Sequence, residues 1–217
     1  MTAASEVGQA ISTRPTAYLF AVLRLAIVVL VAVAIVATFF DTATRATINP
    51  FNFFGYFTMQ SNIITAVILL LASLATFMGR AQSPMLVLAR ACATTYIVIV
   101  GIVYNTLLAG LEGGVSLDWA NWVLHVLFPI YAALDWILFG DHDTLPWKHL
   151  WVALTFPVVW TIVVLIRGAT DGWVPYPFLD PAQGYGVVAL YCISIFALTA
   201  IVGALVFVLS RVRIIKP

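Results

Sequence analysis

Six long, uninterrupted apolar segments run through this 217-residue chain. An α-helix needs about 20 consecutive apolar residues to cross the roughly 30 Å hydrocarbon core of a membrane. We therefore expect membrane-spanning segments at residues 17–40, 56–78, 85–111, 119–139, 149–166 and 187–209. The first is longer than the apolar region of about 7 to 15 residues in a signal peptide, so we expect it to remain as a span.

The segments are continuously apolar rather than alternating, which favours helices over the strands of a membrane barrel. Hydrophobic residues make up 63% of the chain and charged residues only 9%, so little sequence is left for a domain outside the membrane. We predict an all-α, polytopic membrane protein in which residues 1–217 form one bundle of six transmembrane helices. No basic stripe or phosphate-binding motif indicates nucleic acid or nucleotide binding.

The distribution of Lys and Arg predicts the orientation of the bundle, because basic residues in short loops stay on the cytoplasmic side. With six spans, one side collects Arg14, Arg80, Arg90, Lys148, Arg211, Arg213 and Lys216. The other side has only Arg45 and Arg167. We expect both termini to be cytoplasmic and the protein to lie in the cell membrane.

Three charged residues fall inside predicted spans near the cytoplasmic side, namely Arg24, Arg90 and Asp135. A charge in the membrane is costly unless it is paired. We expect a structural ion pair between Asp135 and one of the two arginines, although a lipid headgroup site or a proton path is an alternative.

Uncharged polar residues gather instead at the outer side. Thr58, Ser61 and Asn62 share one face of the second span, since residues three and four apart on a helix are neighbours. The same depth is expected for Asn105 of the third span and for Asp118, Asn121 and His125 of the fourth. Arg167 and Asp180 are candidate pocket or loop residues nearby.

Two of these residues suggest chemistry. Thr58 supplies a hydroxyl, which becomes a nucleophile only within reach of a base. His125 is the only histidine in the interior of a predicted span, since His142 and His149 lie in or next to the cytoplasmic loop, and it can act as that base. Asp118 or an asparagine is a candidate to orient the imidazole, and Asn62, Asn105 or Asn121 to stabilise an oxyanion. Ser61 is the rival hydroxyl, and helix packing is the alternative for every one of these groups. Pro129 is expected to free the carbonyl of His125 and bend the fourth span.

No metal or organic cofactor is expected. One intramembrane histidine without an HExxH or CxxC pattern is too few ligands for zinc. Cys92 and Cys192 both lie in predicted spans and are expected to behave as small apolar residues.

Three motifs carry a family resemblance: "YFTMQSN" (56–62), "NWVLHVLFPIYAALDW" (121–136) and "WVPYPFLD" (173–180). With their order and spacing over most of the chain, the sequence resembles the androgen-induced-gene family of six-span membrane proteins, which includes the androgen-dependent regulator of tissue factor pathway inhibitor, and most of all that family's bacterial branch. Animal members hydrolyse fatty acid esters of hydroxy fatty acids with a threonine nucleophile and a histidine partner. The resemblance implies these roles for Thr58 and His125.

We therefore expect an intramembrane hydrolase of lipid esters, acting on a membrane lipid or fatty-acyl ester near the outer leaflet. The sequence leaves two alternatives: a transporter or binding protein for a small solute or lipid, and a non-catalytic membrane scaffold. It does not specify an oligomeric state.

Overall fold

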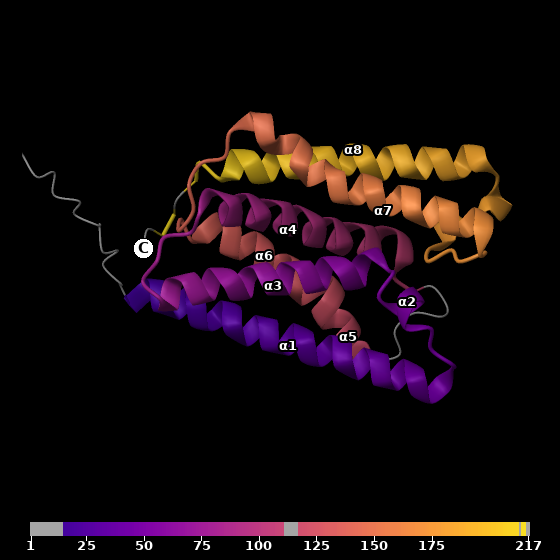
Figure 1. The fold of residues 1–217 in the computed structure, drawn as a ribbon, viewed down its shortest axis with the longest axis horizontal. Coiled ribbons are helices and arrows are strands. Elements are labelled where there is room, and N and C mark those ends of the chain that lie inside the picture. The colour runs from indigo at the N-terminus through magenta and orange to yellow at the C-terminus, as the bar shows by residue number, and fades with distance from the viewer. Residues whose placement is uncertain (1–14, 111–116, 213, 216–217) are drawn as a thin grey trace, which may run out of the picture.

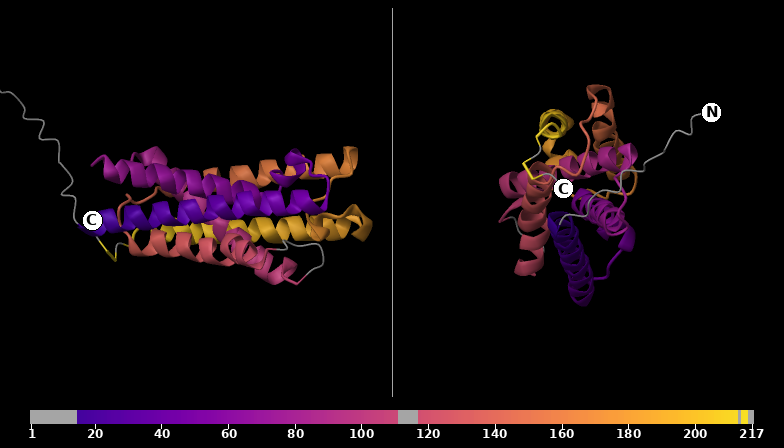
Figure 2. Two further views of the ribbon diagram at one scale, coloured as in Figure 1. Left: turned by 90° about the horizontal axis from the view of Figure 1, so that it is seen from below. Right: turned by 90° about the vertical axis from the view of Figure 1, so that its left-hand side faces the viewer.

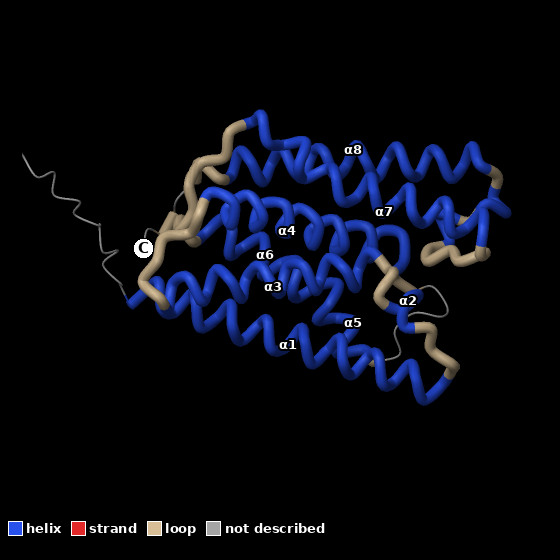
Figure 3. The backbone as a smooth tube through the Cα atoms, viewed as in Figure 1, coloured by secondary structure: helices blue, strands red, loops and turns tan. Residues whose placement is uncertain are grey.

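The computed structural model describes residues 15–110, 117–212 and 214–215. The described residues are built from helices joined by short loops (Figure 3). Six helical segments are long and apolar enough to cross a membrane, as expected of a multi-pass membrane protein. The expected end of the third span, Leu111, and the basic residues Arg14, Arg213 and Lys216 lie outside the described residues.

Each of the first three spans consists of one continuous α-helix, and the third ends in a π-helical turn. α1 (Pro15–Arg45) is followed by the short α2 (Pro50–Phe53), then by α3 (Phe57–Phe77) and α4 (Pro84–Val103), which continues into a π-helical turn, η1 (Tyr104–Leu108). α1 continues five residues beyond the expected end, where Arg45 pairs with Asp41 one turn earlier.

The fourth span is interrupted: α5 (Asp118–Trp122), the π-helical turn η2 (Val123–Leu127) and α6 (Phe128–Leu138) follow one another without a loop. The short 3₁₀ turn η3 (Trp147–His149) leads into α7 (Leu150–Thr170), which is longer than expected and contains Pro157. Two 3₁₀ turns, η4 (Pro177–Leu179) and η5 (Pro181–Gln183), precede α8 (Tyr185–Leu209).

Local sequence explains several of these boundaries. The Ser83 side chain accepts a hydrogen bond from the Leu86 amide, and Pro84 occupies the first turn, so α4 has a standard N-cap. α3 and α7 each end next to a glycine with positive φ, Gly79 and Gly172. Only glycine adopts that conformation without strain.

The helices form one elongated bundle (Figures 1 and 2). α4 is its central helix, packing against α3, α6, α7 and α8, while α1 lies on α3. Burial reflects this arrangement, since 61% of an 18-residue apolar stretch of α4–η1 is buried inside the protein, but only 11% of the corresponding stretch of the segment that contains α7. α7 and α8 thus form a peripheral pair on one side of α4.

The two ends of the bundle differ. At one end, residues 171–184, here called the cap, join α7 to α8, and the cap residues Tyr176, Phe178 and Leu179 are buried against the helices. At the opposite end, α1 begins and α8 ends (Figure 1). There Ile215 pairs with the backbone next to Phe139, at the end of α6.

Candidate functional site

The two π-helical turns face each other near the cap end and bring together Tyr104 of η1 and His125 of η2. Their rings are stacked with centroids 3.8 Å apart and planes 22° from parallel. A π turn inserts an extra residue into a helix, and such turns are frequent at functional sites.

The π turn η2 leaves two carbonyl groups without their usual helical donors. The Phe128 amide donates to Val123 instead of Leu124, and Pro129 has no N–H to offer the carbonyl of His125. Asparagine side chains replace both donors, because Nδ2 of Asn62 lies 3.4 Å from the Leu124 oxygen and Nδ2 of Asn105 lies 3.1 Å from the His125 oxygen.

Each of these asparagines also donates to a carbonyl on its own helix, Asn62 to Thr58 at 2.8 Å and Asn105 to Gly101 at 2.7 Å. An amide nitrogen has two N–H bonds, so both are used in each case. In this structure Asn62 and Asn105 therefore hold the π turn against α3 and α4 and have no N–H left for an oxyanion.

His125 is buried, with 4% of its surface exposed. Its Nδ1 lies 3.0 Å from the backbone oxygen of Asn121. A carbonyl only accepts, so Nδ1 carries the proton and Nε2 keeps the lone pair that a base needs. The Asn121 side chain donates to the Tyr104 hydroxyl at 2.6 Å. Asp118 is exposed, whereas the Asn121 backbone is hydrogen-bonded to the imidazole and orients it.

Thr58 lies in the first turn of α3, where amides have no partner within the helix. Its amide donates to the Tyr176 hydroxyl oxygen at 3.2 Å, and its own Oγ1 is also 3.2 Å from that oxygen. Burial raises the pKa of Tyr176 to about 12, so the phenol stays protonated at neutral pH and can donate to Thr58 Oγ1. Among the described residues, Thr58 and His125 share no hydrogen bond.

Thr58 lines a cavity of about 290 Å³ that lies between α4, α7 and α8 beneath the cap. Its hydroxyl-bearing end is formed by Thr58, Tyr104 and Tyr176. The remaining walls are mostly aliphatic and aromatic: Phe57, Ile99, Val100, Val103, Leu108, Pro157, Val158, Trp160, Thr161, Ile162, Phe178, Leu179, Cys192, Ile193, Ile195, Phe196 and Thr199. His125 is not in the wall, but it stacks on Tyr104, which is.

Three further expected site residues lie away from this cavity. Ser61 is fully buried and its hydroxyl has no hydrogen-bond partner in the described chain. Arg167 pairs with Asp171 and Asn52 and covers the ring of Trp173, so it braces the cap. Asp180 accepts from the Ala182 amide and caps η5.

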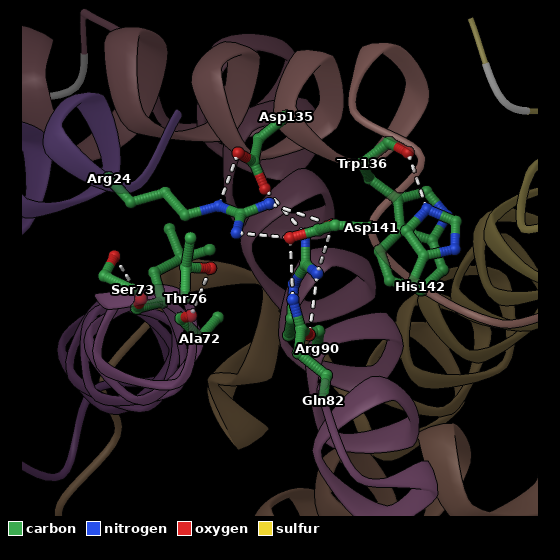
Figure 4. A network of polar contacts seen from close by, with 11 residues as sticks. Arg24, Ala72, Ser73, Thr76, Gln82, Arg90, Asp135, Trp136, Asp141 and His142 are labelled. Carbon is green, nitrogen blue, oxygen red and sulfur yellow. Dashed lines mark hydrogen bonds and ion pairs between the residues drawn. The ribbon is translucent and has the colours of Figure 1, made fainter. Parts of the chain in front are cut away.

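The intramembrane charges form a separate cluster near the start of α4 and the end of α6, which is the end opposite the cap. Figure 4 shows its contacts. Asp135 pairs with both Arg24 and Arg90, at 2.7 and 2.8 Å, and Asp141 from the loop after α6 pairs with the same two arginines. These four residues are called the ionic cluster below. Gln82 bonds Arg90 and Asp141 at its edge.

Burial disfavours ionisation of Asp141, but Arg90 and Arg24 outweigh it and hold the pKa of this carboxyl well below its ordinary value. The ionic cluster contains two positive and two negative side chains, so its net charge is zero. Arg90 and Tyr104 lie roughly 20 Å apart along α4, at 1.5 Å per residue, so the cluster is remote from Thr58.

Sequence reasoning missed Asp141, Tyr104 and Tyr176. Asp141 and Tyr176 lie in loops, and the contacts that define them join residues 117 and 118 positions apart. Among the described residues, no group of three or more His, Cys, Asp or Glu side chains could hold a metal ion.

The chain matches no protein-family model, no curated protein and no solved structure.

Proposed function

We propose that this membrane protein hydrolyses a lipid ester and that Thr58 is its nucleophile. The observation that carries the proposal is the position of the Thr58 hydroxyl, at the polar end of an apolar cavity within the membrane-spanning bundle. Such a cavity suits a hydrocarbon chain, and the hydroxyl lies where the chain's ester group would be. The motif resemblance supports the same residue.

In this proposal His125 is the general base. Its Nδ1 is fixed by Asn121, which leaves Nε2 to take a proton. Thr58 Oγ1 attacks the ester carbonyl carbon while its proton passes to His125, and Tyr176, the neutral donor beside Oγ1, stabilises the oxyanion. Proton transfer needs a hydrogen-bond distance or one bridging water, so substrate binding must bring the pair together or trap that water.

Collapse of the oxyanion breaks the ester C–O bond, and the departing alkoxide takes the proton from His125. The product is an alcohol and an acyl-threonine. Water then attacks the acyl carbon with His125 again as base, which releases the fatty acid and restores the Thr58 hydroxyl. No cofactor is required by this sequence of steps.

We also propose that the cap end faces the outside of the cell membrane and that both termini are cytoplasmic. The excess of basic residues in the loops at the opposite end supports this orientation. Reporter fusions to the C-terminus test it, and an externally located reporter would reverse the assignment.

A second candidate function is lipid binding without hydrolysis. It is favoured by the observation that the Thr58 hydroxyl already has Tyr176 as its partner and shares no hydrogen bond with His125 among the described residues. In that case the hydroxyls would only hold the polar end of a bound lipid.

Labelling with a fluorophosphonate probe and hydrolysis of fatty-acyl esters by the purified protein in nanodiscs test the proposal. Thr58→Val replaces the hydroxyl by a methyl group of the same shape, and we expect it to abolish labelling and lower hydrolysis by roughly 10³-fold or more. Ser61→Ala is the matched control, since it removes a buried hydroxyl one turn away. Equal labelling of wild type and Thr58→Val would exclude Thr58 as the nucleophile, and lipid binding without any turnover would favour the second candidate.

A further inference from the structure

The cavity beside Thr58 is open toward the surface that faces the membrane. Val158 and Ile162 of α7 and Ile193 and Phe196 of α8 line it, yet the same side chains are 38 to 66% exposed. They belong to the spanning parts of both helices, so the medium that meets this opening is the hydrocarbon interior of the membrane.

Outside the hydroxyl-bearing end of the cavity, the polar side chains of the wall have no free donor for water. Thr161 donates to the Pro157 carbonyl at 2.8 Å and Thr199 donates to the Ile195 carbonyl at 2.7 Å. Both hydroxyl protons are therefore used within their own helices, and the rest of the wall is apolar. A cavity of this kind favours hydrocarbon over water.

The cavity wall extends along α8. Its wall includes residues from Cys192 to Thr199, a rise of about 10 Å at 1.5 Å per residue. Tyr176, Phe178 and Leu179 of the cap close the end near Thr58, and Pro157 and Thr199 lie toward the opposite end of the bundle.

A second apolar cavity of about 420 Å³ lies between α7, α8 and the cap. It shares Leu179, Cys192 and Ile193 with the first. Ile193 thus borders both cavities and is 66% exposed on the membrane side, which makes it the side chain most able to obstruct entry.

We propose that one hydrocarbon chain of a membrane lipid enters from the bilayer between α7 and α8, past Ile193. The chain then lies along α8 with its carbonyl end at Thr58 and Tyr176 and its terminal methyl toward Thr199. The direction of the bound chain rests on the proposed function, whereas the entry route follows from the exposed lining residues alone.

Photocrosslinking tests this route directly. The protein is placed in nanodiscs that contain palmitic acid with a diazirine midway along its chain, irradiated, and digested to map the modified residues. We expect adducts on the cavity-lining residues of α8 and α7. Ile193→Trp should lower this labelling roughly fivefold or more, because the larger ring would occupy the opening between α7 and α8 that the chain must pass.

Leu190→Trp is the matched control, since Leu190 is on the same helix, is 64% exposed and lines neither cavity. It should label like wild type. Equal losses in both variants, or adducts spread over the exposed surface of the bundle without enrichment at the cavity, would overturn the proposal. Ile193→Phe, a smaller change, should give an intermediate loss and replaces Ile193→Trp if that variant does not fold.

The outcomes separate this inference from the proposed function. Thr58→Val should keep the α8 adducts while losing hydrolysis. If the cavity is labelled but the protein hydrolyses no ester, the proposed function is rejected and the entry route is supported. If the protein hydrolyses esters but the cavity is never labelled, the entry route is rejected and the proposed function is supported.

Discussion

Replacing Asp135 by Asn tests whether the ionic cluster is a structural element of the bundle. The carboxylate of Asp135 binds Arg24 through one oxygen and Arg90 through the other, and all three side chains are at most 2% exposed. In Asp135→Asn, two buried guanidinium groups would share the single carboxylate of Asp141. Removing one partner of a buried ion pair costs about 3 to 5 kcal/mol, a large part of the roughly 5 to 15 kcal/mol by which proteins are stable.

The exposed pair between Arg167 and Asp171 provides the control. Its side chains are 26% and 48% exposed, so Asp171→Asn should lower the free energy of unfolding by about 0 to 1 kcal/mol. Both variants can be compared by unfolding in mixed micelles with increasing SDS at pH 7, followed by tryptophan fluorescence. If the two substitutions destabilise the protein equally, the cluster does not have the energetic role inferred from its burial.

A compensating substitution sharpens the comparison. Adding Arg90→Met to Asp135→Asn leaves one arginine, Arg24, opposite one carboxylate, Asp141. This double variant should be more stable than Asp135→Asn alone, because the excess positive charge is gone. A further loss of stability would contradict an explanation based on charge.

Three other substitutions give separate tests. A Cβ at Gly101 would lie 2.8 Å from the Pro129 ring, so Gly101→Ala should lower stability by about 1 to 3 kcal/mol in the same SDS assay; an unchanged midpoint would contradict the close approach of α4 to α6. Burial lowers the pKa of His142, and the charge of Arg90 lowers it further. The hydrogen bond to the Trp136 carbonyl acts in the opposite direction but is outweighed. The neutral form of His142 therefore stabilises the fold above about pH 6.5, and this contribution is lost as the pH falls through the lowered pKa. His142→Gln should flatten the decline of stability between pH 7.5 and 5, and a parallel decline in both proteins would refute it. Thr199→Leu should shift hydrolysis toward shorter acyl chains, since each methylene excluded from the cavity costs about 0.8 kcal/mol, measured as kcat/KM over a series of ester lengths; an unchanged preference would show that the chain does not reach Thr199.

The sequence predicts the six spans well because the length of an apolar run directly reflects the thickness of the membrane. It also places Thr58, Asn62, Asn105 and His125 at one depth. In the structure Asn62 donates to the backbone carbonyl of Thr58 and to that of Leu124, the neighbour of His125. Depth follows from position along a helix, so simple counting is enough for this part.

The partners of these residues could not be obtained in the same way. Tyr176 and Asp141 come from segments without helical periodicity, and their positions depend on how loops fold back over the bundle. The roles of Asn62 and Asn105 depend on a π turn, for which Pro129 is the only signal in the sequence. Position along the sequence indicates which polar groups share a depth, but the hydrogen bonds that these groups make depend on how the loops and the π turn fold.

The π turn at Val123–Leu127 also determines what the insertion or deletion of one residue would do to the fourth span. One residue more or less in a helix turns everything beyond it by about 100°. Loss of the extra residue would swing Asp118 and Asn121 to another face of the helix while leaving Asp135 in the ionic cluster untouched. Deletion of a single residue at this point would therefore reorient α5 relative to α6 while leaving the residues of the ionic cluster in place.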